Sequence, residues 1–137
     1  MIKVQRKYYN LVECYHNKRA LFIFGDNTIQ IGKAGQAVIR DLSNSFGIPT
    51  KWFPSTEDNA YFDDKDYDKI EKVLNDKFNE LIEYSKQYND IIFPKMGLGT
   101  GLSELPTRAP KVFKLLNDLL LKHFNLIQDE TGFLIEN

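Results

Sequence analysis

Two apolar runs, each followed by a glycine-rich loop, constrain the fold of this chain most strongly. Ala20–Phe24 and Ile91–Phe93 are continuous runs of strand-forming residues, as expected of parallel strands that are covered on both faces. Turn-forming residues end the first run at Gly25, and Pro94 ends the second. A helical pattern follows each loop. Strand and helix therefore alternate, which favours a mostly parallel sheet between helices.

The length and composition fit one domain. With 137 residues, of which 42% are hydrophobic, the chain can bury a core without disulfides or a structural metal. We therefore predict a single α/β domain over residues 1–137. It has three layers, with a mostly parallel or mixed sheet between helices.

Periodicity predicts the remaining elements. A helix that ends at Gly47 is indicated by an apolar residue at every fourth position: Ala34, Val38, Leu42 and Phe46. Residues 48–53 look extended, because the residue before Pro49 avoids helical geometry. Residues 54–66 are polar and turn-rich, and predict a surface loop whose aspartates cap the next helix.

Helices also dominate the second half of the predicted fold. One is indicated by apolar residues from Ile70 to Tyr88, and another runs from Thr107 to Phe124 with Pro110 in its first turn. The short apolar runs Leu11-Val12 and 132–135 are rich in strand formers, and the second predicts an edge strand.

Several classes of protein are excluded. A net charge of −1 argues against a broad nucleic-acid surface, although a local pocket can still be positive. Cys14 is the single cysteine, so no disulfide forms within the chain, and its distance from His16 and His123 matches no metal-ligand spacing; we interpret these three as structural or surface residues. No apolar run is long enough to span a bilayer and no signal peptide is evident. We expect a cytoplasmic protein without metal or cofactor.

The two loops have the chemistry of a phosphate site. Both should lie at the carboxyl ends of their strands, where ligands bind in open α/β sheets. Glycine lets backbone N–H groups approach a phosphate, and a helix N-terminus adds partial positive charge. Gly97, Gly99 and Gly101 alternate, and Thr100 adds a hydroxyl. The alternative is a tight turn between strand and helix. Neither loop has the Walker Gly-Lys-Ser/Thr sequence.

Candidate ligand-binding residues follow from this placement. They are Gly25, Asp26, Asn27, Lys33, Gly35, Gln36, Thr50, Lys51, Lys95, Gly97, Leu98, Gly99, Thr100 and Gly101. Asp26 and Asn27 are also the catalytic candidates, since a carboxylate can act as a general base and an amide can orient water or ribose; an Asx turn is the alternative. The lysines either neutralise phosphate or lie in solvent.

Other conspicuous side chains have a structural alternative. Trp52 and Phe53 either stack on a base or pack in the core. Glu104 and Arg108 flank Pro106, and we expect them to form an ion pair that braces the second loop rather than to take part in catalysis.

These residues resemble the macrodomain superfamily, whose members bind ADP-ribose. The likeness covers residues 20–124 and is carried by Ile91–Pro94 with the Gly/Thr-rich loop and Leu105-Pro106, and by Asp26-Asn27 with Gly32–Gly35. The usual Asn-Ala-Ala/Asn segment and unbroken triple glycine are absent. Segments such as Phe24–Asn27 and Gly97–Leu102 are also similar to small bacteriophage proteins.

A weaker resemblance is to the lysine-decarboxylase-like nucleotide-processing group, through Gly99-Thr100 and Glu104. Three functions remain open at this point. The chain binds and sequesters a nucleotide signal such as ADP-ribose, in a phage-infected host if it is phage-encoded. Alternatively it hydrolyses ADP-ribose 1″-phosphate or ADP-ribosylated substrates, or it cleaves the glycosidic bond of a nucleotide. Oligomeric state is not predicted.

Overall fold

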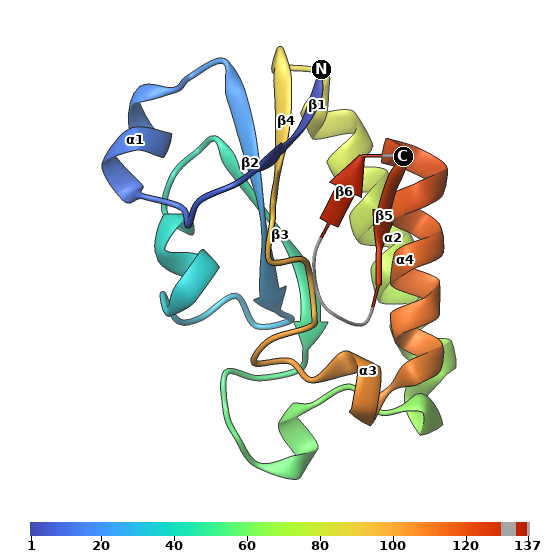
Figure 1. Cartoon of the computed structure of the whole chain (residues 1–137). Coiled ribbons are helices and arrows are strands. Elements are labelled where there is room, and N and C mark those ends of the chain that lie inside the picture. Colours follow the sequence, from blue (N-terminus) through green and yellow to red (C-terminus); the bar gives the residue numbers. More distant parts are fainter. Residues whose placement is uncertain (130–133, 137) are drawn as a thin grey trace.

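A four-stranded parallel sheet forms the centre of the molecule (Figure 1). The computed structural model describes residues 1–129 and 134–136. The strands are β1 (Ile2–Gln5), β2 (Ala20–Asn27), β3 (Ser45–Lys51) and β4 (Asp90–Pro94), and their order in the sheet is β1-β4-β2-β3. All three pairings are parallel. The predicted α/β class is confirmed.

Helices cover the two faces of the sheet unequally. On one face lie α1 (Leu11–His16) and the short 3₁₀ helix η1 (Gly35–Ile39), which pack on Phe22 and Phe24. On the other lie α2 (Tyr67–Ser85) and α4 (Pro110–Phe124), which pack on Leu21 and Ile23. Successive side chains of β2 therefore enter opposite cores, which explains its uninterrupted apolar sequence. These are the three predicted layers (Figure 1).

Position in the sheet explains the strand sequences. The apolar strands β2 and β4 are central, whereas β1 and β3 are at the edges. β1 alternates apolar and polar residues and gives a weak strand signal, so the sequence analysis missed it. β3 contains Pro49, which an edge strand tolerates because one of its sides makes no ladder hydrogen bonds.

Two local predictions were wrong. Leu11-Val12 begins a helix, not a strand, because the Asn10 side chain caps it by accepting a hydrogen bond from the Glu13 N–H at 3.0 Å. The predicted helix through Phe46 is instead the five-residue η1 followed by β3. Phe46 and Gly47 pair with Ile23 and Phe24 of β2, so pairing between strands overrides the local four-residue period.

The second half of the chain agrees with its predictions in part, since the helix predicted from Thr107 to Phe124 begins at Pro110 and Thr107 lies in a separate short helix. Residues 54–66 form a connection with two short 3₁₀ helices, η2 (Asp58–Ala60) and η3 (Asp64–Asp66). The aspartates act differently from the prediction: Asp66, at the N-cap of α2, makes no side-chain cap, whereas Asp64 accepts hydrogen bonds from the first turn of α4. Pro110 begins α4, after the short α3 (Leu105–Arg108).

The C-terminal residues form a separate two-stranded sheet. β5 (Leu126–Gln128) pairs antiparallel with β6 (Leu134–Glu136). The predicted strand at residues 132–135 overlaps β6, and its residues 132 and 133 lie outside the described part of the chain.

Candidate functional site

The topology creates a crevice between the carboxyl ends of β2 and β4. The chain leaves β2 toward η1 on one face of the sheet, and it leaves β4 toward α3 and α4 on the other. Adjacent parallel strands whose connections depart to opposite faces form a topological switch point, where ligands bind in open α/β sheets. Both predicted loops begin at this point.

The crevice opens because β2 and β4 separate. Their pairing ends at Phe22 and Ile92, although β2 continues to Asn27. The Tyr9 hydroxyl lies at the start of this fork, 2.7 Å from the Ile23 carbonyl oxygen and 3.2 Å from that of Ile92. Burial, and secondarily the Cys14 thiol, raise the pKa of Tyr9 well above its usual value, so its hydroxyl remains a donor.

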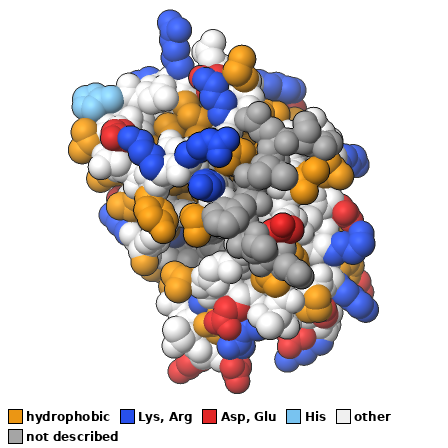
Figure 2. Space-filling model, in the orientation of Figure 1, with side chains coloured by type: hydrophobic (Ala, Val, Ile, Leu, Met, Phe, Trp, Pro, Cys, Tyr) orange, Lys and Arg blue, Asp and Glu red, His pale blue; other side chains and the backbone are white. Residues whose placement is uncertain are grey.

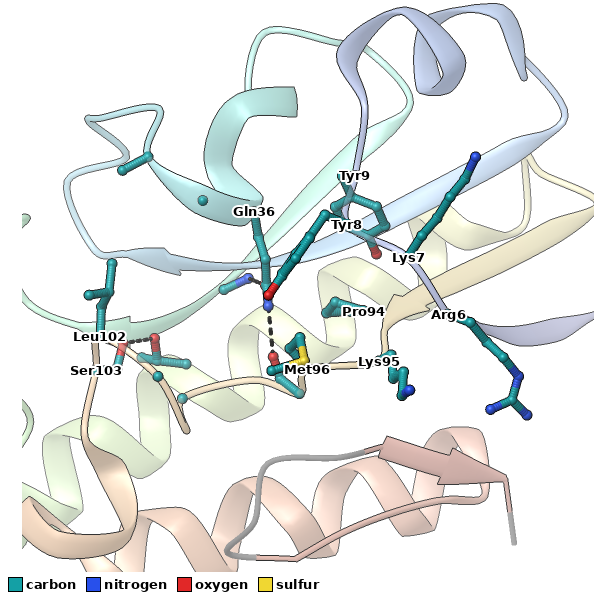
Figure 3. A pocket seen from close by; sticks show the side chains of 17 residues that line it. Arg6, Lys7, Tyr8, Tyr9, Gln36, Pro94, Lys95, Met96, Leu102 and Ser103 are labelled. Carbon is teal, nitrogen blue, oxygen red and sulfur yellow. Dashed lines mark hydrogen bonds between the residues drawn. The ribbon is translucent and has the colours of Figure 1, made fainter.

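A cavity of about 800 Å³ occupies the fork. This volume is in the range of small-molecule sites in proteins. Its lining comes from the segment after β1, from both predicted loops and from the end of β3: Arg6, Lys7, Tyr8, Tyr9, Gly25, Ala34, Gly35, Gln36, Thr50, Pro94, Lys95, Met96, Gly97, Gly99, Gly101, Leu102 and Ser103. Figure 3 shows these side chains from close by.

Backbone donors line one end of this cavity. Among the described residues, the N–H groups of residues 99–103 have no hydrogen-bond acceptor, whereas those of Gly97 and Leu98 are paired. Of these five residues, Gly99 and residues 101–103 line the cavity. Beside them, the hydroxyls of Thr50 and Ser103 are 2.5 Å apart and buried. A Cβ at Gly101 would have no atom within 4 Å, so the backbone there faces open space. Such amides suit an anionic ligand.

Basic side chains lie at the other end. In Figure 3, Arg6 and Lys95 are on the opposite side of the cavity from Leu102 and Ser103, and Tyr8 and Met96 lie between. Lys7 also pairs with Glu13 at 2.9 Å. In the part of the chain that the structure describes, no carboxylate lines the cavity. Figure 2 shows basic and hydrophobic side chains gathered on this face. The cavity therefore combines positive charge with apolar surface.

Two glutamines fix the start of the second loop. Gln36 Nε2 donates to the Gly97 carbonyl oxygen at 2.9 Å. Gln128, on β5, accepts from the Leu98 N–H at 2.6 Å and donates to its carbonyl oxygen at 2.8 Å. Gly99 has a φ of +82°, and a Cβ there would overlap Leu105, so this glycine is required by the fold.

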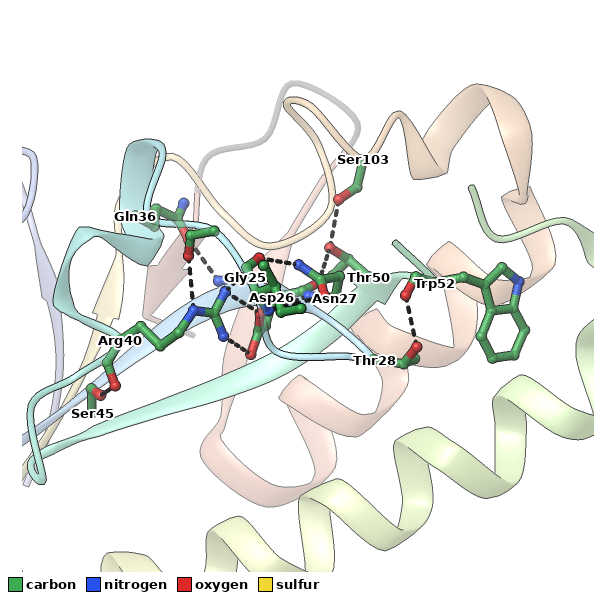
Figure 4. Close-up of polar contacts among 12 residues, drawn as sticks. Gly25, Asp26, Asn27, Thr28, Gln36, Arg40, Ser45, Thr50, Trp52 and Ser103 are labelled. Atoms are coloured by element: carbon green, nitrogen blue, oxygen red, sulfur yellow. Dashed lines mark hydrogen bonds and ion pairs between the residues drawn. The ribbon is translucent and has the colours of Figure 1, made fainter. Parts of the chain in front are cut away.

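The end of β2 is closed by its own polar groups (Figure 4). The two carboxylate oxygens of Asp26 accept from Arg40 at 2.6 and 2.8 Å, and both side chains are largely buried. Asn27 does not form the predicted Asx turn; its side-chain nitrogen donates to the Ile31 carbonyl oxygen, four residues further on, at 2.8 Å and so closes a wider turn. Gly47 lies against this ion pair, where a Cβ would come within 2.8 Å of the Asp26 Cβ.

The structure thus brings part of the predicted site together. The candidate residues that line the cavity are Gly25, Gly35, Gln36, Thr50, Lys95, Gly97, Gly99 and Gly101. Those that do not are Asp26, Asn27, Lys33, Lys51, Leu98 and Thr100.

Each of these other candidates has a different partner. Lys33 pairs with Asp41 at 2.5 Å, Leu98 is buried in the core, and the Thr100 hydroxyl donates to the Met96 oxygen at 3.0 Å. Lys51 donates to the Ser55 oxygen at 2.6 Å and lies over the Tyr61 ring; burial lowers its pKa.

Other predicted side chains have structural roles. Trp52 packs edge-on against Phe62, in agreement with the alternative that it packs in the core. The expected ion pair between Glu104 and Arg108 forms at 3.4 Å, and Arg108 also contacts Asp58. Cys14 is buried. Among the described residues, no group of His, Cys, Asp and Glu could hold a metal ion, and no helix is long and apolar enough to cross a membrane.

Sequence reasoning missed the segment after β1. Arg6, Lys7, Tyr8 and Tyr9 line the cavity, as do Met96, Leu102 and Ser103. The alternation in Ile2–Gln5 was the available signal: once these residues are assigned to a parallel strand, the basic and aromatic residues that follow fall at the ligand-binding edge.

Comparison with known proteins identifies the family. Residues 4–119 match the model of a family described as "Family of unknown function (DUF7831)". The chain belongs to this family. Searches of curated proteins and of solved structures gave no match. Every described residue that lines the cavity falls within the matched segment, whereas Gln128 lies beyond it.

Proposed function

We propose that this member of the family binds a phosphate-bearing nucleotide, such as ADP-ribose, in the cavity between β2 and β4. The observation that carries the proposal is the lining: Gly99 and residues 101–103 have unpaired backbone N–H groups, Arg6 and Lys95 add basic side chains, and the described lining residues include no carboxylate. Amides and cations of this kind favour phosphate oxygens. The resemblance to macrodomains favours ADP-ribose within this class.

The apolar part of the lining suits the rest of such a ligand. Tyr8 is 80% exposed and Leu102 is 78% exposed, although both line the cavity mouth. An aromatic ring and an aliphatic side chain in such positions can contact the flat face of a base or the sugar.

We further propose that the nucleotide is sequestered and not turned over. A general base must reach the proton that it removes. Asp26 is held by Arg40 and Asn27 by Ile31, and neither lines the cavity. The described lining contains no His, Cys, Asp or Glu. We propose that the protein acts in the cytoplasm, the location predicted from the sequence.

Calorimetry tests the binding. We expect ADP-ribose to bind at least about tenfold more tightly than adenosine, because only the former presents phosphates to the amides and cations. Equal affinities for the two, or no binding of either, would refute the proposal.

Product analysis tests sequestration. The protein is incubated with excess ADP-ribose 1″-phosphate, with an ADP-ribosylated peptide or with a nucleoside monophosphate, and the products are identified by mass. Recovery of unchanged nucleotide is expected. Multiple turnovers would establish the hydrolase instead, and release of free base would establish a glycosidic-bond hydrolase.

A further inference from the structure

One side-chain amide crosses the fork between β2 and β4. Gln36 Oε1 accepts from the Gly25 N–H at 2.8 Å, and Gln36 Nε2 donates to the Gly97 carbonyl oxygen at 2.9 Å. Gly25 belongs to β2, and Gly97 follows β4. Backbone pairing between the two strands has already ended at Phe22 and Ile92, so this side chain replaces a missing connection (Figure 3).

The two partners require an amide. The Gly25 N–H needs an acceptor and the Gly97 carbonyl needs a donor, and a primary amide supplies both from one planar group. A carboxylate supplies only acceptors, and a hydrocarbon supplies neither. Gln36 is half-buried on η1, and both the oxygen and the nitrogen of its amide are engaged, so we assign its role to the amide.

This connection acts on the part of the loop that lines the cavity. Gln36 holds the carbonyl of Gly97, and Gln128 holds both backbone groups of Leu98 from the opposite face of the sheet. The unpaired N–H groups begin at the next residue, Gly99. The position of these donors relative to Gly25 therefore depends on Gln36.

We propose that Gln36 is a positioning residue, which sets the separation of the two loops and thereby the affinity of the cavity for its ligand. The predicted effect of Gln36 on affinity rests on the proposed function. Its predicted effect on the position of the loop does not. Pre-organised donors bind more tightly because less ordering is needed when the ligand arrives.

The first experiment needs no ligand. Gln36→Leu removes both hydrogen bonds at similar size, and Gln87→Leu, at an exposed position on the turn after α2, is the matched control. Amide hydrogen exchange and amide chemical shifts are measured by NMR. We expect exchange at Gly25 to accelerate at least about tenfold and the amide signals of residues 97–103 to shift, because the loop loses its anchor. Unchanged signals at residues 97–103 would overturn the proposal.

The second experiment uses ADP-ribose as the probe. Gln36→Glu keeps the acceptor for Gly25, but at about pH 8 it places a carboxylate against the Gly97 carbonyl oxygen; at about pH 4.5 a protonated Glu donates to it again. We expect affinity to fall at least about tenfold at the higher pH and to return within about threefold of the wild type at the lower pH.

The controls separate positioning from loss of the fold. Gln36→Leu should bind weakly at both values of pH, and Gln87→Glu should match the wild type at both. Circular dichroism establishes that each variant is folded. A Gln36→Glu affinity that is independent of pH would contradict the proposal. If the wild type binds no ADP-ribose, the proposed function fails, whereas the exchange experiment still decides the role of Gln36.

Discussion

β2 and β4 are neighbours in the sheet, but the polar groups at their carboxyl ends differ in whether they are paired. At the end of β2, side chains satisfy one another: Asp26 pairs with Arg40, and Asn27 closes a turn on Ile31. After β4, the side chains of Leu98 and Leu105 are buried, while the backbone N–H groups of Gly99 and residues 101–103, which line the cavity, have no acceptor among the described residues. Two glycine-containing loops at neighbouring strand ends therefore differ in which of their polar groups remain unpaired.

The difference shows how little a polar residue at a strand end reveals by itself. Asp26 and Asn27 have the chemistry of a site, but each has an internal partner. The glycine loop after β4 has no carboxylate or side-chain amide, and its backbone is accessible because glycine has no side chain. The following changes test this contrast, in order of their expected effect.

Gly47→Ala should have the largest effect. The new Cβ would collide with the Asp26 carboxyl group and displace it from Arg40. We expect a loss of about 4 kcal/mol in the free energy of unfolding, from overpacking together with a disrupted buried ion pair. Urea denaturation measures it, with Gly101→Ala as the matched control. A loss as small as that of the control would show that the end of β2 is not closed in this way.

Gly99→Ala should come next. Its positive φ disfavours a side chain, and the Cβ would overlap Leu105. We expect a loss of about 3 kcal/mol in the free energy of unfolding, measured by the same denaturation. A stable variant with impaired binding of ADP-ribose would instead place Gly99 in direct contact with the ligand.

Asp26→Asn should cost about 2 kcal/mol of stability, because Arg40 keeps a buried charge with a weaker partner. Among folded molecules, affinity for ADP-ribose should stay within about twofold of the wild type, since Asp26 does not line the cavity. Calorimetry measures this affinity. A severe loss of binding or of turnover would show that Asp26 takes part in the site.

Gly101→Val should change stability least, by no more than about 0.5 kcal/mol, because no atom lies within 4 Å of the added Cβ. Its effect is on the ligand: the side chain enters the cavity, and affinity for ADP-ribose should fall at least about tenfold. Normal affinity in this variant would show that the second loop does not contact the ligand.

The sequence was sufficient for features that depend on local pattern. The runs at Ala20 and Ile91 predicted the two central strands, and the loops after them predicted the edge that carries the cavity. Pro110 was correctly placed in the first turn of a helix. In each case a few neighbouring residues contain the whole signal.

Features that depend on partners distant in the sequence could not be predicted from local patterns. Phe46 has the spacing of a helix, but it pairs with Ile23 of β2. Arg40 neutralises Asp26, and Gln128 holds Leu98 across 30 residues of chain. No local sequence pattern indicates such partners. The short strand β1 was missed for a similar reason, since its place in the sheet depends on β4.

The pairing of β1 with β4 has a consequence for synthesis on the ribosome. The N-terminus of Met1 donates to the carbonyl of Asn89, 88 residues further along the chain. At ordinary elongation rates, the first strand waits roughly 4–18 s before its partner has been made. During that interval the parallel pair β2 and β3 can form alone with η1 between them, since its segments are close in sequence. The site is therefore completed late, when β4 enters between β1 and β2.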